Sequence, residues 1–265
     1  YFEQFGCVIG DEAHLFKAKS LTGIMTKLHQ CKYRFGLTGT LDGTQTHKLV
    51  LEGLFGAAEK VVSTKDLIDK KTLANLKIKC ITLKHPNIRQ KMTYAEELDY
   101  IVSKESRNKF ILDLCNTLNG NTLCLFQLVE KHGKVLYDGM KGSENVYFVY
   151  GGTDTEQRER IRGLVEGHRK STTIASYGTF STGINIRNIN NIVLASPSKS
   201  KIRVLQSLGR GLRISPSKDS VLVFDIADDI SYKERRNFTL NHFFERLNIY
   251  NEEEFNYEIS KVKIK

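Results

Sequence analysis

The stretch Phe5-Gly6-Cys7-Val8-Ile9-Gly10-Asp11-Glu12-Ala13-His14 places two adjacent carboxylates directly after a short apolar run. A run of this length and composition is typical of a buried strand. In open sheets of parallel strands, ligands bind beyond the carboxyl ends of the strands, which is where Asp11 and Glu12 are expected. Alone, the tetrapeptide from Asp11 to His14 is more typical of a solvated turn with Asp11 capping a helix, and it is the rest of the chain that favours the binding site.

Two later blocks favour a binding site. Leu37-Thr38-Gly39-Thr40 ends the next strand-like run, although Thr-Gly-Thr is by itself also a common turn. The block Gln206-Ser207-Leu208-Gly209-Arg210-Gly211-Leu212-Arg213 places two arginines three positions apart, a spacing that puts them on one face if this block is helical. Guanidinium groups bind phosphate oxygens in a bidentate manner and remain charged at cellular pH. The alternative for these arginines is a solvated basic helix face.

Apolar runs of strand length alternate with amphipathic stretches along the chain, which predicts an α/β fold with parallel sheets flanked by helices. Several runs are continuously apolar, as expected for central strands that are buried on both faces. The predicted strands are 5–9, 33–37, 60–63, 78–83, 122–127, 146–150, 172–176, 191–195 and 221–224, and the predicted helices are 21–29, 47–54, 95–118, 130–138, 154–165, 201–209 and 231–247.

The chain has 265 residues, enough for one large domain or two ordinary ones. We expect a boundary near residue 72, which gives domains of 1–72 and 73–265. Residues 1–72 contain 10 Lys and Arg against 8 Asp and Glu, whereas residues 73–265 contain 30 against 22. The basic surplus of the second part suits a polyanion such as nucleic acid, although basic surfaces also serve solubility.

Composition argues against several other classes of protein. No apolar stretch approaches the roughly 20 residues needed to span a bilayer, and the first residues lack the features of a signal peptide. The five cysteines do not form Cys-x-x-Cys pairs or metal-ligand spacings, and those in apolar runs, such as Cys7, are expected to be buried reduced thiols. His29, His132 and His168 are expected at the surface or at helix caps. These features predict a cytoplasmic protein.

In their order along the chain, the three blocks resemble motifs II, III and VI of superfamily 2 helicases and translocases, which are ATP-driven motors on nucleic acid. The resemblance implies one partial and one complete RecA-like domain, with ATP and Mg²⁺ bound between two such domains. Asp11 is then the Mg²⁺ ligand and Glu12 the catalytic base, while His14 couples the nucleotide site to the second domain. Thr38, Gly39 and Thr40 link hydrolysis to movement. Around the nucleotide, the implied residues are Gln206, Gly209 and the arginine fingers Arg210 and Arg213.

The block Tyr177-Gly178-Thr179-Phe180-Ser181-Thr182-Gly183-Ile184-Asn185 resembles motif V of the same family. Thr179 and nearby backbone N–H groups are candidates to hold a nucleic-acid phosphate. The resemblance implies that Gly183 and Asn185 lie toward the nucleotide. The family often has Asp at the position of Asn185, which leaves the ribose contact of this residue open.

Two further basic or polar segments are candidates for phosphate contacts. Gln127 and Lys131 occupy the position of motif IV, although an ordinary strand end followed by an exposed helix explains them equally well. Lys199 and Lys201 lead into the motif VI helix, where phosphate contact and a solvated helix start are equally good interpretations. The pairs Lys70-Lys71 and Arg235-Arg236 are interpreted as surface charge.

The amino-acid sequences of four segments closely resemble those of the recombination and branch-migration helicases of T-even phages, namely segments 126–133, 149–153, 175–183 and 198–206. This resemblance implies an enzyme that remodels branched DNA, including forks, Holliday junctions and R-loops, in which RNA is also present, and a location in the cytoplasm of the host cell if the gene belongs to a phage. We expect a monomer. The Gly-rich loop with Lys-Ser or Lys-Thr that cradles phosphates in this family does not precede Asp11, and we expect it upstream of Tyr1. The chain alone is therefore expected not to hydrolyse ATP.

Three other functions remain open at this point. Within the motor class, the sequence also fits an RNA helicase or the translocase subunit of a restriction enzyme. Outside that class, it fits a nucleic-acid-binding module that clamps DNA without hydrolysing ATP. A phosphate-cradling loop encoded in frame upstream supports a motor, and its absence supports the clamp.

Overall fold

The computed structural model describes residues 1–39, 41, 45–86, 88, 90–179, 186–198, 208–209, 212 and 218–265. Among these residues, residues 1–63 form one compact unit and a second begins at Thr64. The division lies nine residues before the boundary expected near residue 72, because the short helix α3 (Thr64–Asp69) belongs to the second unit. The predicted strand at 60–63 is wrong, since these residues have no regular structure.

The first unit contains a two-stranded parallel sheet covered by helices. Strand β1 pairs in parallel with β2, with Ile9 opposite Phe35. Its core is made by Met25, Leu28 and Cys31, with partly buried aromatic rings packed against them. The elements of this unit are η1 (Phe2–Gln4), β1 (Cys7–Gly10), η2 (Ala13–Leu15), α1 (Lys19–Lys27), β2 (Tyr33–Gly36) and α2 (Gln45–Phe55).

The two faces of the small sheet differ sharply. On one face, a Cβ at Gly10 would lie 2.9 Å from the ring of Phe16, and a Cβ at Gly36 would lie 2.9 Å from the ring of Phe55. Glycine is therefore needed at both strand ends for the close approach of these rings. On the other face, Ile9 is 64% exposed and Phe35 is 52% exposed. Cys7 is also exposed on this unit, which corrects the expectation that its thiol is buried.

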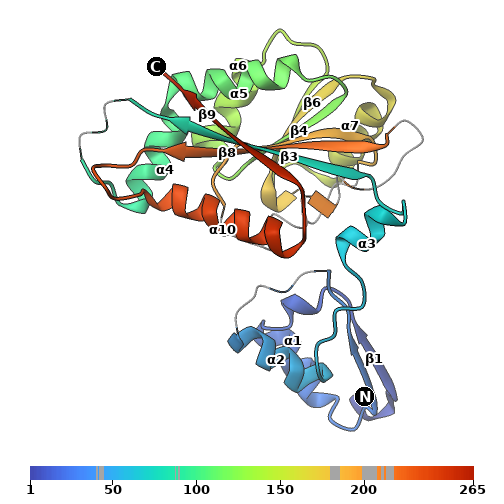
Figure 1. The fold of residues 1–265 in the computed structure, drawn as a ribbon. Helices are drawn as coiled ribbons and strands as arrows, with labels where there is room; N and C mark the ends of the chain where they lie inside the picture. The colour runs from blue at the N-terminus through green and yellow to red at the C-terminus, as the bar shows by residue number, and fades with distance from the viewer. Residues whose placement is uncertain are drawn as a thin grey trace. The chain divides into compact units, whose positions relative to one another are not determined.

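The second unit is built around a seven-stranded sheet in the order β5-β6-β4-β7-β8-β3-β9, in which every neighbouring pair is parallel. Helices cover both faces of this sheet (Figure 1). The strands are β3 (Asn75–Lys84), β4 (Asn121–Phe126), β5 (Val146–Val149), β6 (Ser171–Ser176), β7 (Ile189–Leu194), β8 (Ser220–Asp229) and β9 (Tyr257–Lys263), and the remaining helices are α4 (Tyr94–Ser103), α5 (Glu105–Thr117), the π-helix η3 (Val129–Gly133), α6 (Lys134–Gly139), α7 (Thr155–Gly167) and α10 (Phe238–Glu252).

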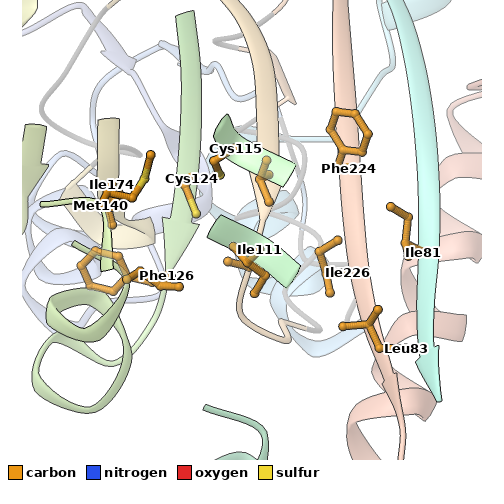
Figure 2. Close-up of a cluster of buried hydrophobic side chains, with 13 residues drawn as sticks. Ile81, Leu83, Ile111, Cys115, Cys124, Phe126, Met140, Ile174, Phe224 and Ile226 are labelled. Carbon is orange, nitrogen blue, oxygen red and sulfur yellow. The ribbon is translucent and has the colours of Figure 1, made fainter. Parts of the chain in front are cut away.

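The main core lies between the sheet and the helix α5. Every residue of β4 is buried, as predicted for a central strand with both faces covered. Figure 2 shows Ile111 and Cys115 of α5 between Cys124 of β4 and Ile226 of β8. The α/β prediction with parallel sheets is therefore confirmed.

Two helix predictions are corrected by the structure. The helix predicted at 95–118 is two helices, α4 and α5, because Lys104 between them has extended backbone angles. The start of α4 is fixed by a capping box, in which Thr93 and Glu96 each accept the other's backbone N–H. The helix predicted from residue 231 begins only at Phe238. None of the helices among the described residues is long and apolar enough to cross a membrane.

Candidate nucleotide and nucleic-acid sites

The paired carboxylates lie at the carboxyl end of β1, as predicted. The N–H of Ala13 donates to the carbonyl of Leu37 at 2.8 Å, and the N–H of Leu37 donates to the carbonyl of Gly10 at 2.8 Å. These bonds join the segments that leave β1 and β2. Glu12 has φ 49° and ψ 49°, a left-handed conformation that costs a non-glycine residue roughly 1–2 kcal/mol. Its N–H donates to the Asp11 carboxylate at 2.8 Å.

His14 connects the two predicted motifs of the first unit. Its side chain is buried, and its Nδ1 lies 3.0 Å from the hydroxyl of Thr38 and 3.2 Å from a carboxylate oxygen of Glu12. The structure therefore brings together Glu12, His14 and Thr38 around one imidazole nitrogen. Gly39 follows on the exposed side of this contact, and Thr40 lies outside the described residues.

The chemistry of the carboxylates fits Mg²⁺ bound together with phosphate. Asp11 and Glu12 are both exposed, and carboxylate oxygens are the hard ligands that Mg²⁺ prefers. Within the described part of the chain, no group of three or more His, Cys, Asp and Glu side chains is placed to hold a metal ion. The site fits an ion that takes one protein carboxylate and completes its shell with phosphate oxygens and water.

In the second unit, the predicted motif IV and motif V residues follow two neighbouring strands, β4 and β6. Gln127 is exposed directly after β4, and its N–H donates to the hydroxyl of Ser196 at 3.1 Å. Thr179 follows β6 and is buried, with its hydroxyl 2.8 Å from that of Ser176. Lys131 is exposed and pairs with a carboxylate of α4 at 2.7 Å. Parallel strands bring Gln127 and Thr179 to the same edge of the sheet.

A buried charge network lies beneath this edge. The guanidinium of Arg107 donates to the Asp228 carboxylate at 2.8 Å and to the carbonyl of Ala195 at 2.7 Å. His85 lies 2.8 Å from the same carboxylate oxygen. Burial alone would raise the pKa of Asp228, but Arg107 and the His85 hydrogen bond hold that pKa below its ordinary value. The network connects the ends of β3, β7 and β8 to the start of α5.

His132 is the second histidine of this network. The expectation that it lies at the surface or at a helix cap is therefore wrong. Its side chain is fully buried, with Nε2 at 3.4 Å from Arg107 and Nδ1 at 2.9 Å from the hydroxyl of Ser196. Burial, together with the charge of Arg107, lowers the pKa of His132 to about 3. Because a guanidinium only donates, Nε2 accepts, and the proton of the neutral ring is on Nδ1.

A second buried ion pair lies between α10 and β8. The guanidinium of Arg246 donates to both carboxylate oxygens of Asp225, at 2.7 and 2.8 Å, and to the carbonyl of Ser198 at 2.8 Å. The hydroxyl of Tyr250 donates to the same carboxylate at 2.8 Å. Burial would lower the pKa of Arg246, but Asp225 raises it above its ordinary value. The guanidinium therefore remains charged in the core.

Together, these groups hold the segment 195–198, which leaves β7. Its carbonyls at Ala195 and Ser198 accept from the two buried guanidinium groups, and that of Ser196 accepts from the hydroxyl of Tyr177 at 3.0 Å. The predicted residues Lys199 and Lys201 come directly after this segment in the chain. None of these buried partners was predicted as a site residue from the sequence.

Several predicted residues lie outside the described residues, namely Thr40, Gly183, Asn185, Lys199, Lys201, Gln206, Arg210 and Arg213. Within the motif VI block, Gly209 is exposed, whereas Leu208 and Leu212 are buried. The N–H of Leu212 donates to the carbonyl of Leu208 at 2.9 Å, the spacing of one helical turn. The carbonyl of Leu212 accepts from Ala74, just before β3, at 2.8 Å.

Comparison with known proteins shows that this chain is similar to helicases. Residues 95–215 match the family described as the helicase conserved C-terminal domain. The whole chain is 36% identical, over 283 residues, to the ATP-dependent DNA helicase UvsW of Enterobacteria phage T4, of which the match covers 56%. The crystal structure of T4 UvsW has a TM-score of 0.61 at 35% identity, over 99% of this chain and 55% of that one.

Two more distant proteins are also similar to this chain. A putative ATP-dependent RNA helicase of Acanthamoeba polyphaga mimivirus is 25% identical over 264 residues, which cover 92% of this chain and 48% of that protein. A putative HsdR subunit fragment of a type I restriction enzyme from Vibrio vulnificus has a TM-score of 0.70 over 98% of this chain and 48% of that one; at 15% identity it supports the fold alone. The chain spans about half the length of these curated relatives. The chain is thus similar to the ATP-dependent DNA helicase UvsW, it has a RecA-like fold, and its residues 95–215 match the helicase conserved C-terminal domain.

Proposed function

We propose that this chain forms part of an ATP-dependent DNA helicase or translocase that remodels branched DNA, such as forks, Holliday junctions and R-loops, in recombination and repair. The similarity to UvsW supports this function, since that relative is an ATP-dependent DNA helicase. The observation that carries the motor interpretation is the contact of His14 with both Glu12 and Thr38. This contact joins a carboxylate suited to hydrolysis with the segment that follows β2.

In the proposed hydrolysis step, Glu12 orients the attacking water and accepts its proton. Asp11 would hold Mg²⁺, which supplies positive charge to the phosphate oxygens of ATP. Arg210 and Arg213 place guanidinium charge at the γ-phosphate, an effect that is worth about 10³–10⁵ in rate in related phosphoryl transfers. Around them, the residues proposed to line the nucleotide are Gly183, Asn185, Gln206 and Gly209.

The same contact suggests how hydrolysis is coupled to movement. A change in the position of Glu12 after phosphate release alters its 3.2 Å contact with His14. The imidazole then shifts relative to the Thr38 hydroxyl, and the change reaches the segment Thr38-Gly39-Thr40. We propose that this segment transmits the state of the nucleotide to the nucleic-acid path.

The nucleic-acid path is proposed to follow the carboxyl edge of the seven-stranded sheet. Gln127 and Lys131 are exposed there, and the backbone around Thr179 is suited to a phosphate contact. Lys199 and Lys201, which follow Ser198 in the sequence, are proposed to add further phosphate contacts. The surplus of eight positive charges in residues 73–265 agrees with a polyanion partner.

The proposed motor is tested by ATP hydrolysis, with and without DNA. This chain alone is expected to show no hydrolysis, because its sequence contains no Gly-rich loop with Lys-Ser or Lys-Thr. A longer polypeptide that joins such a loop to this chain is expected to hydrolyse ATP faster when DNA is present. Glu12→Gln should abolish turnover, while Glu3→Gln, an equal charge change at another exposed position, should not. Equal turnover by both variants would remove Glu12 as the base.

Nucleic-acid preference is tested by unwinding of matched DNA and RNA junctions by the same longer polypeptide. The proposal predicts unwinding of the DNA junctions and little of the RNA duplex. Preferential unwinding of RNA would assign the chain to the class of its mimivirus relative instead. Binding of DNA without any ATP turnover would identify a clamp.

A further inference from the structure

A pocket of about 510 Å³ lies at the carboxyl edge of the seven-stranded sheet, apart from the residues assigned above. It is formed by the connection from β3 to α4 and by the connection from β8 to α10. The parallel strands β3 and β8 end side by side, with Lys84 opposite Asp229, and Figure 1 shows α4 and the start of α10 beside them. Its volume is within the range of about 300–1,000 Å³ typical of ligand sites.

The walls of the pocket are braced by hydrogen bonds. The buried carboxylate of Glu97 accepts from the N–H groups of Phe238 and Thr239 at 2.9 and 3.0 Å. Asn237 accepts from the N–H of Ile230 at 3.1 Å and donates to the carbonyl of Asp228 at 3.1 Å. Because Glu97 already occupies the N-terminus of α10, any affinity of the pocket for anions must come from side chains.

The rim of the pocket carries an excess of unpaired positive charge. Lys91, Lys233, Arg235 and Arg236 line it, and all four are exposed. In the part of the chain that the structure describes, none of the four forms an ion pair with a carboxylate. Some other exposed cations of this unit are paired, as Lys131 is with its carboxylate on α4. The exposed carboxylate of Glu234 also lines the pocket, so the rim has more positive than negative side chains. The guanidinium of Arg236 lies over the ring of Phe244, 4.6 Å from its centre, and its charge is not neutralised there, so the four rim cations retain a net attraction for an anionic ligand.

The inner surface of the pocket is apolar and aromatic. Met92, Ile230, Tyr232 and Phe238 line it, and Phe238 is 40% exposed. The ammonium group of Lys233 lies over the ring of Tyr232, 5.4 Å from its centre. A basic rim beside an apolar, aromatic wall suits a ligand that has both phosphates and flat rings.

Lys233 has a backbone conformation that glycine adopts more readily than other residues. Its φ is 53°, in the left-handed region, within a turn closed by two backbone hydrogen bonds between Tyr232 and Arg235. Non-glycine residues outside Asn and Asp are uncommon in this region. The sequence thus places a positive charge at the tip of the turn in spite of the conformational cost.

We propose that this pocket, which the rim and wall residues define, binds a segment of single-stranded nucleic acid. The rim cations contact its phosphates, and a base packs against Tyr232 and the neighbouring apolar surface. Only an unpaired base has a face free for this packing, which favours a single strand over a duplex. The pocket lies on the same sheet edge as Gln127 and Thr179. Three strand spacings, about 15 Å, separate β6 from β8, so one strand can follow the edge past all of them.

The proposal rests on the proposed function, and the chain offers a matched pair of variants to test it separately. Lys71 is also an exposed lysine with positive φ, 55°, but it precedes the amino end of β3, at the opposite edge of the sheet. Lys233→Gly and Lys71→Gly therefore remove the same charge from the same backbone conformation. Neither is expected to lower stability, because glycine adopts positive φ readily.

The assay is the anisotropy of a labelled oligothymidylate bound to this chain, measured across a range of salt concentrations. Lys233→Gly should weaken binding and lower the magnitude of the salt slope by about 0.7, the value for one phosphate contact in a single strand. Lys71→Gly should change neither. Tyr232→Leu should lower affinity on the order of tenfold for oligothymidylate but not for an abasic oligonucleotide of equal length.

Equal effects of the two glycine variants, or no effect of either, would overturn the pocket while leaving the proposed motor intact. Absence of oligothymidylate binding by the wild-type chain would overturn both. Binding of oligoglutamate that depends on Lys233, in the absence of oligothymidylate binding, would identify the pocket as a site for acidic peptides and refute the proposal.

Discussion

The buried His132 makes the stability of the second unit depend on pH in a calculable way. Burial beside Arg107 lowers its pKa from 6.5 to about 3, so the folded state holds the neutral ring. Between these two values the unfolded chain binds the proton and the folded chain does not. The contribution of the neutral His132 to the free energy of unfolding is therefore fully present above pH 6.5, and it is lost as the pH falls toward 3. At about 1.36 kcal/mol per pH unit, the loss from pH 7.5 to pH 5 is about 2 kcal/mol.

The assay is urea denaturation at pH 7.5 and pH 5, for the wild-type chain and for His132→Asn. Asparagine keeps an N–H near the position that donates to Ser196, but it does not titrate. Other groups also titrate in this range, so the quantity compared is the difference between the two proteins. The wild type should lose about 2 kcal/mol more than the variant on acidification. An equal loss in both would show that His132 is not held neutral, and would refute the argument from burial and Arg107.

Three other predictions concern packing, buried charge and the basic segment. Gly133→Ala should lower the free energy of unfolding by about 1–3 kcal/mol, because its Cβ would lie 2.5 Å from a buried phenylalanine ring. Gly163→Ala, at a helix position with open space around it, should instead stabilise the protein by up to about 1 kcal/mol. Thermal unfolding of both variants checks this. Arg246→Met should cost about 3–5 kcal/mol in urea denaturation, since it leaves a carboxylate buried without its partner. Lys199→Ala and Lys201→Ala should each weaken DNA binding regardless of base sequence and flatten its salt dependence, and an unchanged salt slope would remove these lysines from the DNA path.

The sequence was most informative where its patterns are periodic or local. Continuous apolar runs predicted the buried strands because both faces of a parallel sheet are covered. The helix predicted from residue 154 begins at Thr155, where the side chain of Asp154 accepts the N–H of Gln157 at 2.7 Å. The contact of His14 with Thr38 was not itself predicted, but both residues follow neighbouring parallel strands that end at one edge, as the strand pattern predicted.

Other features depend on tertiary contacts that no local pattern records. Strand β9 was missed because its side chains are mostly exposed and charged, as is common for an edge strand. The buried Arg107 and Arg246 resemble ordinary helix surface residues in the sequence. A signal for their partners was present, since Asp225 and Asp228 interrupt an apolar strand that predicts burial, and a buried carboxylate requires a buried cation. The pocket beside Tyr232 also escaped prediction, because its walls come from segments more than 130 residues apart.

The central claim is that Arg213 acts on the same ATP as Glu12, and the most direct test is Arg213→Ala in a longer polypeptide that contains the phosphate-binding loop. ATP turnover and DNA affinity are measured on the same preparation. The account predicts that turnover falls by about 10³ or more while DNA affinity stays within about twofold. Retained turnover together with lost DNA binding would contradict it.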